Sequence, residues 1–319
     1  MIAAWLLLFV PVLHASSAWS FLSSTPVQRV SSTKTLTGDE LLRIGDIHER
    51  QGHFPETLRY YDLALSTYRE NKQTHGVANA LVKIAHVYER QGRFQDAHVA
   101  LQEALPILAR SSDVIAHARA LLVMGRVSAR LRLVEEARES LNHAVALFDQ
   151  LKERHERNDA LVQLGLVQVD DGLIDQGLSL LKEARQDAQT RRDHGQLLQA
   201  VEALGNVYGA LNQVNDARRY YDEGLRLAEA ERNMILEAAL RLRLAYLDAG
   251  AGQLTEGIQL GTDALFLSRT EQDVATEAAA LSLLADLYRK TGRIDEAEES
   301  AERALSIYRS RQIFVHGLR

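Results

Sequence analysis

The sequence predicts an all-α fold, a solenoid of seven consecutive helix-turn-helix units. One small residue recurs every 40 positions, without insertion or deletion. Apolar residues within each period follow the spacing of two amphipathic helices, and a glycine recurs between these two helices in most units. A constant period of this length is typical of solenoids, in which each unit packs against its neighbours. The recurring small residues are Gly45, Ala85, Gly125, Gly165, Gly205, Ala245 and Ala285.

The first predicted helix of each unit, helix A, carries this small residue. A large apolar residue precedes it by one position in every unit. Another precedes it by four positions in every unit except the sixth, which has Arg241 there. These spacings place the apolar side chains on one helix face. A small residue on that face allows a second helix to approach closely, because a larger side chain would fill the space between the two axes.

The second predicted helix, helix B, has apolar or small residues 9, 12 and 19 positions after the small residue of helix A. The turn between the helices has glycine in five units, and Arg132 and Asn212 in the other two. Glycine and asparagine readily adopt the left-handed conformation that ends a helix. Arginine does not, so we expect the turn of the third unit to close differently.

The second unit shows the most complete pattern. Its marked positions are Leu81, Ile84, Ala85, Tyr88, Ala97, Leu101 and Ala104. This pattern resembles the tetratricopeptide repeat, in which helix A carries a bulky residue, a Leu-Gly pair and an aromatic residue, and helix B carries alanine and a large residue. The resemblance extends over residues 37–316 and implies a right-handed superhelical arrangement of the units. The usual period of that family is 34 residues, so we expect longer helices to accommodate the additional residues.

The repeat defines the predicted domain organisation. The seven units span 37–76, 77–116, 117–156, 157–196, 197–236, 237–276 and 277–316, followed by a short tail at 317–319. We expect polar surface connectors at 70–76, 153–157 and 190–195. Pro106 should bend helix B of the second unit, because proline removes a backbone hydrogen bond. Arg185 and Asp187 replace apolar residues in the fourth unit, which predicts a frayed last turn, with a hinge or a polar contact site as the alternative.

The first 36 residues differ from the repeats. Residues 2–13 are almost entirely apolar, but this run is shorter than the roughly 20 residues of a membrane span. Small residues at 16–18 follow it, so we expect a signal peptide over 1–18 and a protein of the secretory pathway or a secreted one. Residues 19–36 are rich in serine and threonine and contain no Asp or Glu. Such a linker is similar to the second part of the bipartite leader of algae with complex plastids, so a plastid location is the alternative.

Composition argues against several classes of function. The net charge of −6 argues against a general nucleic-acid binder, which usually has a basic face. The absence of cysteine excludes disulfides and thiolate metal sites. The sequence contains no nucleophile-elbow, phosphate-loop or paired zinc motif, and its 11 histidines are scattered. We therefore expect no enzymatic activity, no cofactor and no metal site.

The remaining candidate is a surface that binds another protein. The resemblance implies that helices A line a concave groove, with the positions one and five after the small residue, and two, three and six before it, facing inward. The candidate groove residues are Asn79, Lys83, His86, Arg90, Arg119, Arg126, Arg130, Asn206, Arg243 and Tyr246. Their basic members cluster in the second and third units, and guanidinium groups pair well with carboxylates. We expect a scaffold that binds a partner peptide or helix, with an acidic segment as the candidate ligand. A peptide-responsive regulator is the alternative, and the sequence does not identify the partner.

Overall fold

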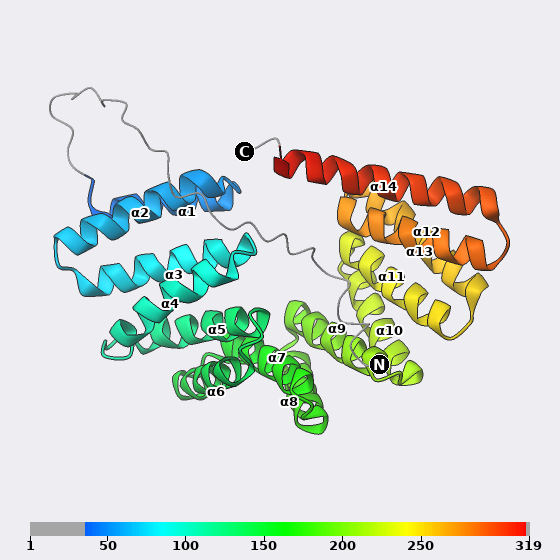
Figure 1. The fold of residues 1–319 in the computed structure, drawn as a ribbon. Coiled ribbons are helices and arrows are strands. Elements are labelled where there is room, and N and C mark those ends of the chain that lie inside the picture. Colours follow the sequence, from blue (N-terminus) through cyan, green and yellow to red (C-terminus); the bar gives the residue numbers. More distant parts are fainter. Residues whose placement is uncertain (1–35, 317–319) are drawn as a thin grey trace. The chain divides into compact units, whose positions relative to one another are not determined.

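The computed structural model describes residues 36–316 of the chain, with side chains up to residue 310. These residues form 14 α-helices and no strand, which confirms the predicted all-α fold of seven helix-turn-helix units (Figure 1). The helices A are α1 (Gly38–Arg50), α3 (Thr74–Arg90), α5 (Val114–Arg130), α7 (Arg154–Asp170), α9 (His194–Ala210), α11 (Met234–Gly250) and α13 (Val274–Lys290). The helices B are α2 (Phe54–Glu70), α4 (Phe94–Leu108), α6 (Val134–Leu151), α8 (Ile174–Arg191), α10 (Val214–Ala230), α12 (Leu254–Thr270) and α14 (Ile294–His316). The predicted signal peptide at 1–18, the tail at 317–319 and all of the 19–36 segment except Leu36 lie outside the described residues.

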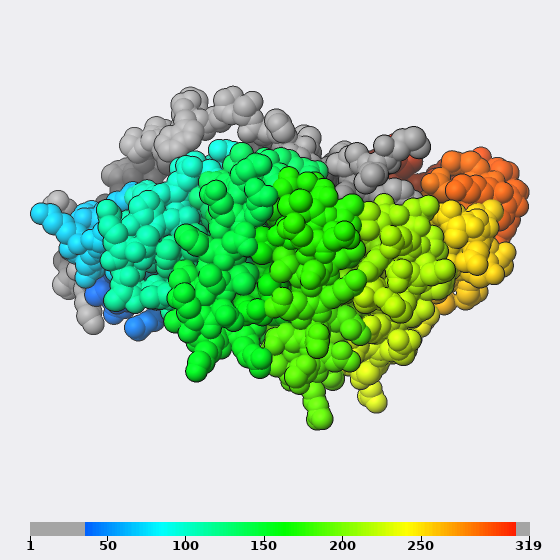
Figure 2. Space-filling view, turned by 90° about the horizontal axis from the view of Figure 1, so that it is seen from below, coloured from blue at the N-terminus to red at the C-terminus, as the bar shows by residue number. Residues whose placement is uncertain are grey.

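The described residues divide between Gly177 and Leu178 into two compact parts, and each is described here by itself. In residues 36–177, one apolar core runs through α1 to α5, and it buries the predicted helix A residues Leu81 and Ile84. On the face visible in Figure 2, neighbouring helix pairs of this part pack against one another without a gap. In residues 178–316, a core joins α11, α12 and α13 and includes Leu242, Ala264 and Leu283.

The connectors between units are shorter than predicted. Helices α3, α7 and α9 already begin at Thr74, Arg154 and His194, so most of the expected connectors at 70–76, 153–157 and 190–195 are helical. Each predicted unit boundary after the first therefore falls three residues inside the next helix A. The additional residues of the 40-residue period extend the helices, as expected. Exposed positions at the start of an amphipathic helix are as polar as a loop, so composition alone cannot separate the two.

Pro106 lies in the last turn of α4. That helix ends at Leu108, two residues earlier than the position equivalent to Glu70 at the end of α2. The missing N–H thus coincides with an early helix end. The longer connector that follows supplies an N-cap for α5, since the Asp113 carboxylate accepts a hydrogen bond from the Ala116 N–H at 3.0 Å.

The turn of the third unit does not close differently, so that prediction is wrong. Arg132 has a φ of 63° and Asn212 a φ of 58°, close to the 75° of Gly52 in the same slot. In each of the three turns the next residue donates its N–H across the turn, and Leu133 donates to the Ser128 carbonyl at 2.9 Å. This hydrogen bond holds the left-handed residue in place whatever its side chain.

The predicted frayed end of α8 is also wrong. The helix is regular to Arg191, where the side chain of Arg191 contacts Asp187 at 2.7 Å. Arg185 contacts both carboxylate oxygens of Glu223 on α10, at 2.8 to 3.2 Å. The polar residues in this helix therefore make ion pairs, which corresponds to the alternative of a polar contact site. Over residues 36–316, no helix combines the length and apolar character that a membrane span needs.

Candidate partner-binding surface

The predicted basic residues of α3 contact acidic residues of the preceding helix A, α1. The Lys83 Nζ lies 2.7 Å from an oxygen of Asp46. The His86 Nδ1 and an Arg90 guanidinium nitrogen each lie 3.3 Å from the same oxygen of Glu49. The cationic groups that the sequence grouped into a basic patch are therefore matched by carboxylates on the same surface.

Arg126 on α5 makes the most complete of these contacts. Its Nε and one Nη lie 2.7 and 2.8 Å from the two carboxylate oxygens of Glu89 on α3, a bidentate pair. Burial lowers the pKa of Arg126, but the hydrogen bond and charge of Glu89 raise it further, so the net shift is upward. The same helix also contacts α7, where Arg119 lies 2.7 Å from Glu156. The hydrogen bond from Arg119 lowers the pKa of Glu156.

We call these contacts between successive helices A the helix A ladder. Its members in residues 36–177 are Lys83–Asp46, Arg90–Glu49, Arg126–Glu89 and Arg119–Glu156. Most of the paired residues are 37 positions apart, three fewer than the period. The ladder fixes long cationic side chains in one geometry and reduces the net positive charge of this surface.

A second part of the ladder lies in residues 178–316. Arg243 on α11 contacts Glu202 and, at 3.0 Å, the Oδ1 of Asn206 on α9. The Tyr221 hydroxyl donates to the same Asn206 oxygen at 2.8 Å. Burial raises the pKa of Tyr221 to about 12. The predicted groove residues Asn206 and Arg243 are thus brought together, but each is held by neighbours within the protein.

The two other predicted residues behave differently. Tyr246 on α11 donates its hydroxyl to the Ala279 carbonyl of α13 at 3.5 Å, and burial raises its pKa to about 12. Asn79 is exposed on α3. Tyr246 therefore contacts the next helix A, whereas Asn79 is open to solvent.

Arg130 is the exception among the predicted arginines. Its guanidinium lies 5.8 Å from the centroid of the Phe94 ring, a cation–π contact. Arg90, one unit earlier, lies 4.9 Å from the Phe54 ring and also contacts Glu49. The counterpart of Glu49 beside Arg130 is Glu89, which Arg126 occupies. Arg130 is exposed, and within residues 36–310 no carboxylate pairs with it.

The sequence interpretation missed the acidic half of this surface. Asp46, Glu49, Glu89 and Glu202 lie beside the basic residues that it selected. A search for opposite charges 37 positions apart could have found several of these pairs. The inward positions were considered within each unit, whereas the pairing joins one unit to the next.

One buried polar cluster contains the residue types of a catalytic triad. Ser128, His98 and Glu136 come from α5, α4 and α6, and both other residues contact one oxygen of Glu136. The Ser128 hydroxyl donates to this carboxylate at 2.8 Å, and His98 Nε2 lies 2.7 Å from it. The carboxylate stands between the serine and the histidine, so the imidazole does not activate the hydroxyl as a nucleophile. Within the described residues, no group of three or more His, Asp or Glu side chains is arranged to hold a metal ion.

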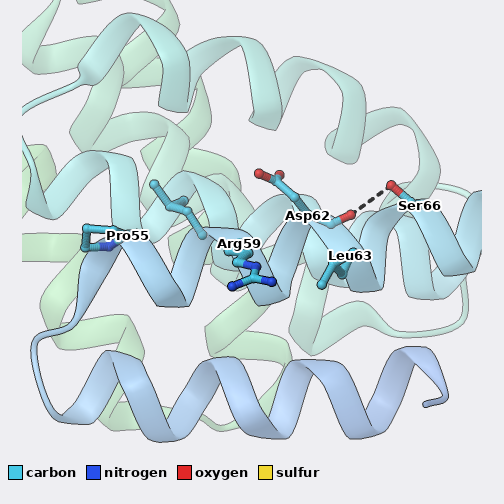
Figure 3. A pocket seen from close by; sticks show the side chains of 6 residues that line it. Pro55, Arg59, Asp62, Leu63 and Ser66 are labelled. Atoms are coloured by element: carbon cyan, nitrogen blue, oxygen red, sulfur yellow. Dashed lines mark hydrogen bonds between the residues drawn. The ribbon is translucent and has the colours of Figure 1, made fainter. Parts of the chain in front are cut away.

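An open hollow lies on the surface of α2 (Figure 3). Its lining residues are Pro55, Leu58, Arg59, Asp62, Leu63 and Ser66. All six belong to one helix, and the hydrogen bond drawn in Figure 3 joins the Ser66 hydroxyl to the Asp62 backbone carbonyl at 3.0 Å. Polar groups from several elements do not converge here, as they do in a small-molecule site.

Comparison with known proteins supports the repeat assignment. Two family models described as the tetratricopeptide repeat match residues 39–110 and 278–311. No curated protein matches the chain significantly.

Solved structures of similar fold include three with low sequence identity. Aspartyl phosphate phosphatase F from Bacillus subtilis has a TM-score of 0.64 and 14% identity, over 85% of this chain and 70% of that one. The apo form of RapI has a TM-score of 0.66 and 14% identity, over 86% and 98%. The Rap conjugation gene regulator of plasmid pLS20, in complex with the Phr* peptide, has a TM-score of 0.59 and 18% identity, over 88% and 76%. The matched repeats and these shared helical arrangements identify the chain as a tetratricopeptide-repeat protein.

Proposed function

We propose that this protein is a non-enzymatic scaffold that binds a peptide or helix of a partner protein on the surface formed by its helices A. The candidate ligand is an acidic segment or a terminal carboxylate. The observation that carries this proposal is Arg130, an exposed guanidinium that is held over Phe94 and lacks a carboxylate partner within residues 36–310.

The surroundings of Arg130 suit a ligand of this kind. The Arg126–Glu89 pair beside it is closed and bidentate, so its charges are satisfied within the protein. An incoming carboxylate can accept two parallel hydrogen bonds from a guanidinium. Because the Phe94 ring already restrains the side chain, less conformational entropy is lost on binding than with a free arginine. The exposed Asn79 supplies a further polar group on the same set of helices.

The test is a binding assay with the full chain and a fluorescein-labelled acidic peptide, with a free carboxylate or an amide at its C-terminus. Arg130→Glu should weaken binding by about tenfold or more, as expected for loss of an interface arginine. Arg59→Glu is the matched control, because Arg59 is an exposed arginine on α2 and its replacement changes the net charge equally. Equal affinities for the two variants would contradict the proposal.

Arg126 is a poor choice for this test. Replacing it with an acid would place a new carboxylate beside Glu89 and leave that buried group without its partner. Breaking a partly buried ion pair in this way destabilises the fold itself. A loss of binding in an Arg126 variant would therefore not separate recognition from folding.

A peptide-responsive regulator is the second candidate. One solved structure of similar fold is a gene regulator in complex with a peptide, and this chain resembles it over 88% of its length. A regulator of that kind should change shape when it binds its ligand. Small-angle scattering with the acidic peptide should then show a saturable change in radius of gyration, whereas a rigid scaffold should show binding without that change.

A further inference from the structure

The last helix, α14, exposes a face that is covered in every earlier unit. Tyr308 stands 23 positions after the small residue of its unit and is 48% exposed. The six residues in the same slot are at most 4% exposed. They are Tyr68, Leu108, Phe148, Ala188, Ala228 and Ser268.

Two neighbouring apolar residues on α14 show the same difference. Ile294 is 51% exposed and Leu305 is 50% exposed, whereas their counterparts in the other six units are partly or fully buried. Together with Tyr308 they form what we call the open face. No helix of the described residues follows α14, which continues to His316 where the earlier helices B have already turned (Figure 1).

The interior units show what kind of element covers this face. It is the next helix A, which contributes a fully buried residue five positions before its small residue. That residue is alanine in five units and Leu240 in the sixth, and leucine or valine follows it in all units except the one with Arg241. An element that covers the open face of α14 therefore needs a helix with alanine and leucine on one stripe.

Charge specifies a further position on that helix. Arg269 on α12 lies 2.8 Å from Glu277 on α13, and Asp149 on α6 lies 3.1 Å from Arg157 on α7. Both pairs join the residue 24 positions after one small residue to the residue eight positions before the next. Arg309 occupies this slot on α14, is exposed and has no ion pair within residues 36–310. Its counterpart Arg269 meets a glutamate, so an acid is expected opposite Arg309 as well.

A second copy of this chain is a poor occupant. The helix A it could offer at its open end is α1, which has Glu40 where the other helices A have a fully buried alanine or leucine. Glu40 accepts a hydrogen bond from the Thr37 N–H at 2.8 Å as part of a capping box. Stacking α1 on the open face would bury this carboxylate against apolar surface, which is costly without a partner charge.

We propose that the open face of α14 binds an amphipathic helix of a partner protein. That helix carries a glutamate or aspartate, then alanine three residues later, and leucines four and seven residues later. These positions share one helix face. The helix α13 has this pattern in Glu277, Ala280, Leu281 and Leu284, and it covers the preceding helix B. This binding surface is separate from Arg130 and does not depend on the proposed function.

The experiment uses the full chain and a fluorescein-labelled peptide with the sequence of residues 274–290, followed by anisotropy. Tyr308→Asp and Leu305→Asp should each weaken binding about tenfold or more. Both positions are half-exposed, so the fold tolerates the change. Leu63→Asp is the matched control, because Leu63 is 45% exposed on α2, away from the open face. This control should bind the peptide like the unchanged chain.

A charge exchange tests the predicted ion pair. Arg309→Glu should weaken binding of the original peptide, and a peptide with Glu277→Arg should recover it on that variant. Binding that is equal for Tyr308→Asp and Leu63→Asp would overturn the proposal, as would binding that is lost in Arg130→Glu. Sedimentation that shows a dimer of the chain, dissociated by Tyr308→Asp, would assign the face to a second copy and overturn the partner helix.

Discussion

The small residue of helix A is required by the side chain that packs on it. A Cβ atom added to Gly45 would lie 2.3 Å from the Tyr61 ring, and one added to Gly205 would lie 2.5 Å from the Tyr221 ring. Where the small residue is Ala85, the counterpart of these tyrosines is Leu101. Close packing of the two helices thus fixes the combined size of two side chains, one from each helix.

Replacing Gly45 with alanine should therefore destabilise the first unit. The Tyr61 ring cannot move away easily, because its hydroxyl donates to Asp46 and Glu49 at 2.6 and 2.8 Å. Overpacking of this kind costs about 1–3 kcal/mol. Gly125→Ala should cost less, because it faces Leu141 and would reproduce the Ala85 and Leu101 combination. Thermal unfolding of the two variants measures the difference, and an equal loss would refute this explanation.

Sequence analysis could predict these glycines but not the ladder. Each small residue repeats the same contact within its own unit, so the period alone exposes it. The pairing of Arg126 with Glu89 depends on how one helix A lies against the next. That orientation is a result of packing and is not visible in a single unit. The prediction of a basic patch therefore selected real surface residues without the carboxylates that neutralise them.

At the scale of the turn, backbone geometry prevails over side-chain preference. Seven residues other than glycine have a positive φ, and six of the seven have long side chains, as Arg132 does. All of them follow a helix, and the next helix is already fixed by packing. The turn conformation is thus set by the two helices that it joins, which is why the residue type at 132 did not reveal it.

Arg132→Gly should stabilise the protein. A left-handed conformation costs an ordinary residue about 1–2 kcal/mol, and glycine recovers part of this despite its greater freedom when unfolded. Asn212→Gly should give a smaller gain, because asparagine tolerates this conformation better. Arg132 also lies 3.7 Å from Asp170, but its side chain is 69% exposed, so the lost ion pair contributes little. Arg132→Ala is the control, and chemical denaturation should show no gain for it.

At the scale of the whole chain, stability comes from contacts between neighbouring units. Most ion pairs of the ladder, such as Arg126–Glu89, join adjacent helices A. In arrays of this kind stability is close to a sum of unit and neighbour terms, so distant units open independently. The seven units were predictable from the period, whereas the division between Gly177 and Leu178 was not, since the small-residue pattern continues unchanged across it.

Hydrogen exchange can test this independence in the full chain. Gly205→Ala should overpack α9 against Tyr221 and destabilise residues 178–316 by about 1–3 kcal/mol. Exchange of amides in α9 and α10 should then accelerate, because local opening becomes easier. Amides in α1 to α4 should keep their rates, since no contact of the described residues joins them to Tyr221 directly. Gly45→Ala should give the reverse pattern. A variant that accelerated exchange equally in both parts would show one cooperative unit, and stability would then have to be assigned to the chain as a whole.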